Sequence, residues 1–138
     1  MRTGAVQSWQ GAAVEHGVPL HRLSADDRSA FSLSVLVSAA EFLVTTGEPV
    51  IGGLHGPTRH FYCPHCKSWM FTRPDGADHL VNVRTPMLDT PEGFAPYLET
   101  FTREKLDWVT TPAVRSFDGF PELADYPGLM QGYRERVG

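Results

Sequence analysis

Cysteine is scarce in this sequence, since Cys63 and Cys66 are the only two among 138 residues. A chain of this length buries roughly two-thirds of its unfolded surface on folding, which is enough for a hydrophobic core. The sequence has no apolar run of about 18 residues and no apolar segment after Met1, so we expect neither a membrane span nor export. Two cysteines without an export signal favour a reducing, cytoplasmic location.

Positive charge is limited as well. The 12 lysine and arginine residues are outnumbered by 16 aspartate and glutamate residues, and the net charge is −4. Nucleic acids and anionic membranes attract basic surfaces, so we expect neither as a partner. The length indicates a single domain over residues 1–138 and leaves the oligomeric state open, a homodimer included.

Turn-forming residues are abundant. The 13 glycines and 11 prolines favour a fold of short strands. Alternating or β-branched runs predict strands at 5–14, 31–37, 42–46, 50–51, 58–62, 67–73, 79–84 and 96–102. A short helix is predicted at 129–137. The sequence therefore predicts a mainly β domain with few short helices.

The spacing Cys63-Pro64-His65-Cys66 suits two chemistries. A tight turn of this kind can present two thiolates to a zinc ion, and the same spacing occurs in dithiol redox sites. A redox pair of this class lies at a helix N-terminus, which lowers the thiol pKa. Here both flanks predict strands, so the pair is expected at the tip of a hairpin. The knuckle-like hairpin is the favoured interpretation, and Cys63 and Cys66 are the predicted metal ligands.

A structural zinc site needs four ligands, and the cysteines supply two. His65 lies inside the turn, and His60 precedes Cys63 by three residues, which directs it towards the opposite face of a strand. Neither is an obvious third ligand. We expect each of the six histidines to be solvated or hydrogen-bonded.

The order of the later motifs resembles the glutathione-dependent formaldehyde-activating enzymes and their centromere protein V relatives. The matching segments are 29–37 with 47–49, the knuckle at 61–68, the strand at 79–83, the Leu-Asp loop at 87–89, the segment 96–108 and the closing segment 117–122. The resemblance covers about residues 29 to 122. It implies a β-tent fold of small antiparallel sheets held by zinc. It also implies carbon–sulfur lyase-type chemistry on a glutathione–formaldehyde adduct.

The first quarter departs from the family pattern. Met1 and Thr3 stand where the family has the two cysteines that join the late pair around a structural zinc. At the second, catalytic zinc the family has Cys-His-Cys-x-x-Cys, and the corresponding residues here are 20–25, of which only His21 is retained. The resemblance thus predicts impaired catalysis. It leaves His21 and Arg22 to contact a glutathione-like small molecule, with Arg22 facing a carboxylate.

Three functions stay open. The first is a non-catalytic scaffold that binds a small molecule or a partner. The second is an enzyme of the same class with rearranged zinc ligands, and the third is a dithiol redox protein that uses Cys63 and Cys66. Lys67 replaces a family glycine at a position that often needs a positive φ. Seven aromatic residues are expected to compensate for a lost zinc by packing in the core, namely Phe31, Phe42, Phe61, Phe71, Phe101, Trp69 and Trp108.

Overall fold

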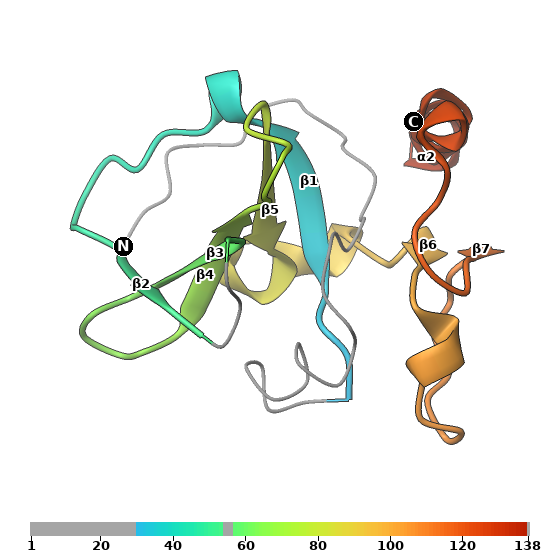
Figure 1. Ribbon diagram of the computed structural model, residues 1–138, viewed down its shortest axis with the longest axis horizontal. Helices are drawn as coiled ribbons and strands as arrows, with labels where there is room; N and C mark the ends of the chain where they lie inside the picture. Colours follow the sequence, from blue (N-terminus) through green and yellow to red (C-terminus); the bar gives the residue numbers. More distant parts are fainter. Residues whose placement is uncertain (1–29, 54–56, 138) are drawn as a thin grey trace.

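The computed structural model describes residues 30–53 and 57–137 (Figure 1). The strands in these ranges are β1 (Ser34–Ser38), β2 (Val50–Gly52), β3 (Arg59–Tyr62), β4 (Trp69–Arg73), β5 (Leu80–Arg84), β6 (Leu98–Glu99) and β7 (Arg115–Ser116). Short 3-10 helices lie between them, namely η1 (Ala39–Glu41), η2 (Thr85–Met87), η3 (Pro91–Gly93), η4 (Thr102–Glu104) and η5 (Leu123–Asp125). The helix α2 (Tyr126–Val137) follows η5. The predicted mainly β class is confirmed.

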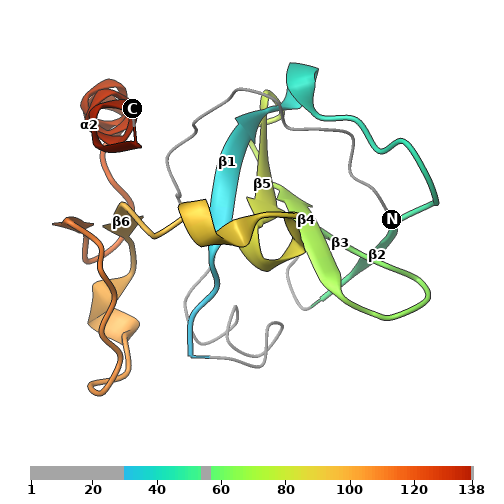
Figure 2. The same cartoon turned by 180° about the vertical axis from the view of Figure 1, so that it is seen from behind.

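Five strands form one antiparallel sheet in the order β1-β5-β4-β3-β2. Val35 pairs with Val83 and Val37 pairs with Val81, so the β-branched residues of two strands meet on one face. Figures 1 and 2 show β6, β7 and α2 together at one side of this sheet. The predicted strands at 31–37, 50–51, 58–62, 67–73 and 79–84 correspond to its five members.

Two apolar clusters hold the fold together. The larger one covers the valine face of the sheet and contains Val35, Val37, Phe42, Met70, Phe71, Val81 and Val83. The smaller one joins Leu36 of β1 to Tyr97, Leu98, Leu129 and Tyr133. Successive residues of a strand point to opposite faces, so Leu36 lies on the face opposite Val35 and Val37. This second face anchors β6 and α2 to the sheet.

The strand predicted at 42–46 is wrong. Phe42 ends η1, and residues 43–46 form no strand. The ring centroid of Phe42 lies 4.7 Å from that of Phe71, while Leu43 is exposed. The apolar run therefore reflects the packing of one aromatic ring and not the pairing of an extended segment.

The strand predicted at 96–102 is shortened to β6. Phe101 adopts a φ of 54°, which ends the extended segment before η4. β6 pairs with β7 in parallel, so the expectation of antiparallel small sheets is wrong for this pair. The predicted helix at 129–137 is present as α2, which begins three residues earlier, at Tyr126.

The aromatic core prediction is correct in part. Phe42, Phe71, Phe101 and Trp69 are buried, and the Phe61 ring stacks on Phe71. Trp108 is 74% exposed and Phe31 is 42% exposed, so the prediction that they pack in the core is wrong for these two residues.

The predicted strand at 5–14 lies outside the described residues. Among those the structure does describe, no helix has the length and apolar character needed to cross a membrane.

Candidate functional site

The two cysteines lie in the turn that joins β3 to β4. The Cys63 N–H donates to the Ser68 carbonyl at 2.9 Å, and the Lys67 N–H donates to the Cys63 carbonyl at 2.9 Å. Lys67 has a φ of 63°, the left-handed conformation that a glycine would adopt without strain. Its Nζ also donates to the Pro64 carbonyl. The predicted hairpin-tip position is confirmed, and Lys67 keeps the positive φ that this glycine position often needs.

The two thiols differ in their environment. Cys63 is half-buried and packs against the larger apolar cluster, whereas Cys66 is exposed. The Cys66 Sγ lies 3.2 Å from the Ser68 Oγ and donates to it when protonated. Hydrogen bonds from Ser68 to the sulfur, with a smaller one from Cys63, lower the pKa of Cys66 from 9.0 to about 7. Cys66 is therefore more readily a thiolate near neutral pH than an ordinary cysteine, and the thiolate is the form that reacts and binds metals.

Cys63 and Cys66 fit only half of a tetrahedral zinc site. In residues 30–53 and 57–137, no group of three or more cysteine, histidine, aspartate or glutamate side chains is placed to hold a metal ion. Structural zinc sites are almost always four-coordinate. The donor set in the described part of the chain therefore does not fit a complete zinc centre, although the turn that presents the two sulfurs is formed.

The residues expected to contact a small molecule are His21 and Arg22, and both lie outside the described residues. His65 is exposed in the turn, as expected for a residue directed away from the sulfurs. His60 is 1% exposed and hydrogen-bonds to Thr72, so it belongs to a separate cluster. The structure does not bring either of these two histidines to the thiols.

A buried polar cluster around Trp69 lies on β3, β4 and β5. Trp69 Nε1 can only donate, so Thr72 Oγ1 accepts its hydrogen at 3.1 Å. Thr72 Oγ1 and His60 Nδ1 lie 2.6 Å apart and share a second hydrogen bond, whose direction depends on which ring nitrogen of His60 carries the hydrogen. The guanidinium carbon of Arg84 lies 4.5 Å from the centre of the Trp69 ring.

This cluster was only partly visible in the sequence. Trp69 and Thr72 are three residues apart on β4, a spacing that regular alternation would place on opposite faces. The pairing of β3 with β4 brings His60 opposite Thr72, and no local sequence motif predicts this strand register. The Trp69 ring lies between His60 and Arg84. The centroid of the His60 ring is 4.5 Å from that of Trp69 in an edge-on arrangement, and the guanidinium of Arg84 packs on the Trp69 ring.

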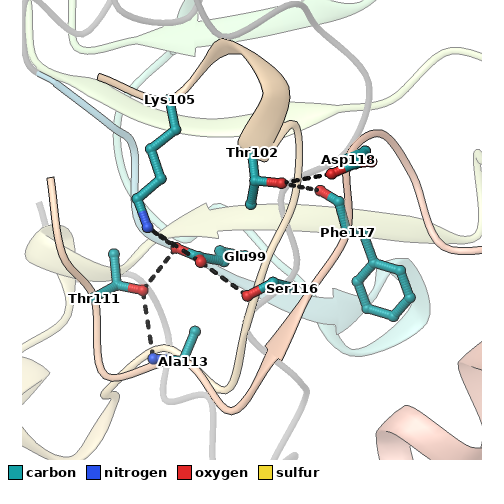
Figure 3. Close-up of polar contacts among 8 residues, drawn as sticks. All are labelled: Glu99, Thr102, Lys105, Thr111, Ala113, Ser116, Phe117 and Asp118. Carbon is teal, nitrogen blue, oxygen red and sulfur yellow. Dashed lines mark hydrogen bonds and ion pairs between the residues drawn. The ribbon is translucent and has the colours of Figure 1, made fainter. Parts of the chain in front are cut away.

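A second polar network is centred on Glu99 of β6 (Figure 3). Its carboxylate accepts hydrogen bonds from Lys105 Nζ at 2.8 and 3.1 Å, from Thr111 Oγ1 at 2.8 Å and from Ser116 Oγ at 2.9 Å. Burial raises the pKa of Glu99, but hydrogen bonds from Lys105, Thr111 and Ser116 outweigh this effect and hold it below 4.5. Glu99 is therefore an anion at neutral pH.

The Glu99 network borders a groove between residues 30–34 and 96–111. Sequence reasoning missed both the network and the groove. Lys105 and Thr111 approach Glu99 from the irregular segment after η4, and Ser116 approaches it from β7. The segment after η4 has no hydrophobic periodicity, so the sequence spacing did not indicate this network.

A comparison with protein families matches residues 24–104 to the model described as glutathione-dependent formaldehyde-activating enzyme. The matched range includes the central sheet, the Cys63–Cys66 turn and Glu99. The closing segment 117–122 lies beyond the matched range, so its resemblance to the family stays a prediction. A search of curated proteins finds no match.

Proposed function

This chain belongs to the family of glutathione-dependent formaldehyde-activating enzymes, and we propose that it is a divergent member that binds a glutathione-like small molecule without the family's zinc-dependent chemistry. The family supports a glutathione-dependent function in general terms. The loss of carbon–sulfur lyase-type activity is the proposal made for this chain, and it follows from the residues at the expected metal sites.

One observation carries the proposal. Cys63 and Cys66 form a well-defined turn, and the described residues around them add no third metal donor. The sequence has no other cysteine, and positions 20–25 offer His21 as the only family ligand of the second site. In the family, a zinc ion there would hold a thiolate at neutral pH and act as a Lewis acid. Leu20, Arg22 and Ala25 are not zinc ligands.

The residues that are present support binding. An arginine can hold a carboxylate through two parallel hydrogen bonds, and glutathione carries two carboxylates. We assign Arg22 and His21 to contact with such a ligand. Both thiols are free, which a reducing cytoplasmic compartment would maintain.

The test combines metal analysis with binding and turnover. Zinc is measured in natively purified protein and in a Cys63→Ser variant, and glutathione binding is measured by calorimetry. Formaldehyde consumption is followed with and without glutathione. We expect zinc well below one ion per chain, binding that is weakened in Arg22→Ala and His21→Ala, and no glutathione-dependent turnover. One zinc per chain that disappears in Cys63→Ser, together with turnover, would contradict the proposal and support an enzyme with recruited ligands.

A dithiol redox protein is the second candidate. The observation in its favour is that Cys63 and Cys66 are both free and Cys66 is exposed at a hairpin tip. Equilibration in buffers of reduced and oxidised glutathione, followed by mass analysis, tests it. Reversible loss of two hydrogens between the cysteines would favour this candidate. Persistence of two thiols under oxidising buffers would remove it.

A further inference from the structure

The groove beside Glu99 has a volume of about 50 Å³. This volume is the space open to the centres of water-sized spheres, and it holds a few water molecules, since roughly 10–15 Å³ is enough for each one. The groove can therefore hold one small polar group. Apolar side chains, among them Leu98 and Val109, line it together with polar ones.

Residues that can donate hydrogen bonds line this groove from two segments. Lys105 lines it, and two of the three N–H groups of its ammonium are taken by the two oxygens of Glu99, which leaves the third to donate. Ser34 accepts a hydrogen bond from Arg84 at 3.5 Å, and because arginine can only donate, the Ser34 hydroxyl hydrogen is available. Ser32, two residues earlier, is buried and also lines the groove, which adds a second hydroxyl.

Glu99 holds Lys105 in place. Its carboxylate already accepts four hydrogen bonds, so it is saturated and does not need a ligand. Lys105 is 25% exposed, and its ammonium cannot turn away from the groove without losing this partner. The left-handed backbone at Phe101 returns the chain so that η4 carries Lys105 back over Glu99.

We propose that the groove binds the carboxylate end of a small molecule, with Lys105 Nζ and the hydroxyls of Ser32 and Ser34 as donors. A carboxylate is an acceptor-only group, and its size suits the groove. Glu99 also lines the groove, but its charge is paired with that of Lys105 and its two oxygens already accept four hydrogen bonds. The carboxylate binding site is independent of the function proposed above. Only the identification of this carboxylate with one end of a glutathione-like molecule rests on that function.

The experiment is a nuclear magnetic resonance titration of the full chain with three probes. N-acetylglycine carries a carboxylate, N-acetylglycinamide is its neutral analogue, and glutathione tests the larger molecule. The variants are Ser32→Ala, which leaves the Glu99 network intact, and Lys105→Gln. The controls are Thr110→Ala, an exposed hydroxyl beside the groove, and Arg136→Gln, which removes a positive charge on α2. Thermal melts show whether each variant is folded.

We expect N-acetylglycine to shift the amides of residues 30–34 and 98–111, and the neutral analogue to bind at least about tenfold more weakly. Ser32→Ala and Lys105→Gln should each weaken N-acetylglycine by about fivefold to tenfold, while the controls stay within twofold. Equal binding of the acid and its amide, or shifts that lie elsewhere, would overturn the site. Glutathione that binds but ignores both groove variants would overturn the identification of its carboxylate with this groove and leave the proposed function standing. N-acetylglycine that binds as expected while glutathione does not would confirm the site and contradict the proposed function.

Discussion

The main-chain N–H of Lys67 donates to the carbonyl oxygen of Cys63 at 2.9 Å, and this bond closes the turn with Lys67 at a φ of 63°. A side chain in the left-handed region costs about 1–2 kcal/mol, and only part of this is recovered by the Lys67 Nζ bond to Pro64. The turn is thus held in a conformation that its own residue disfavours.

Replacing Lys67 with glycine should stabilise the fold. We expect Lys67→Gly to raise the free energy of unfolding by about 0.5–1 kcal/mol, because glycine adopts this φ without strain. Urea unfolding measures the change. Lys67→Ala is the matched control, since alanine keeps the strain and loses the Nζ bond. A glycine variant no more stable than the alanine variant would show that the turn is not strained.

The reactivity of Cys66 should follow the hydrogen bonds of Ser68. In a Cys63→Ser background only Cys66 can be alkylated, and its rate with iodoacetamide should reach half its maximum near pH 7. Adding Ser68→Ala should move this midpoint towards 9.0, because the largest cause of the lowered pKa is removed. Identical midpoints in the two proteins would mean that Ser68 does not stabilise the thiolate.

The Thr72 hydroxyl forms hydrogen bonds with the buried side chains of both His60 and Trp69. Thr72→Val should lower the free energy of unfolding by about 2–4 kcal/mol, because Trp69 Nε1 and His60 Nδ1 both lose this partner. Urea unfolding measures the loss. Thr72→Ser keeps the hydroxyl and should cost no more than about 1 kcal/mol. Equal losses in the two variants would assign the effect to the missing methyl packing and not to the hydrogen bonds.

Glu99 should make stability depend on pH. Its folded pKa lies below its unfolded value, so its stabilisation is present above the unfolded pKa and is lost as pH falls through the folded pKa. Glu99→Gln should therefore cost about 1 kcal/mol at pH 7, a figure reduced for solvent screening, and the cost should shrink below about pH 4. Urea unfolding of both proteins across pH 3–7 measures this. A constant difference over that range would contradict the assignment.

The parts of the fold that sequence reasoning predicted well are those with local signals. The alternation of β1, β5 and the β3–β4 hairpin is visible in the chain, and the family resemblance marks Lys67 as standing at a glycine position. What it missed depends on distant pairing. Glu99 meets Lys105 and Thr111 of the irregular segment after η4 and Ser116 of β7, and no pattern in the sequence predicts these contacts.

The errors also have a physical cause. Trp108 was expected in the core because it is large and apolar, yet much of a protein surface is apolar, and Trp108 is exposed. The run at 42–46 has strand-forming residues, but only Phe42 finds a buried partner, and β propensity depends on such partners. Propensity alone could not separate an anchored loop from a paired strand.

Two glycines of α2 provide an internal control for the packing of the helix against β6. A Cβ built on Gly132 would lie 2.2 Å from the Tyr97 hydroxyl oxygen, whereas a Cβ on Gly128 meets nothing within 4 Å. Gly128→Ala should therefore stabilise the protein by about 0.5–1 kcal/mol, since alanine favours a helix over glycine. Gly132→Ala should destabilise it by about 1–3 kcal/mol, because Tyr97 is buried and has to move.

A third variant separates helix propensity from the clash at Gly132. In Tyr97→Phe the hydroxyl oxygen is absent, and the nearest remaining atom to the new Cβ would be the ring carbon at 3.2 Å. Adding Gly132→Ala to Tyr97→Phe should then cost at least about 1 kcal/mol less than adding it to the wild-type protein. Urea unfolding of the four proteins gives this coupling energy. A coupling of zero would mean that the hydroxyl does not contact the helix at Gly132, and that α2 packs on the sheet in a different register.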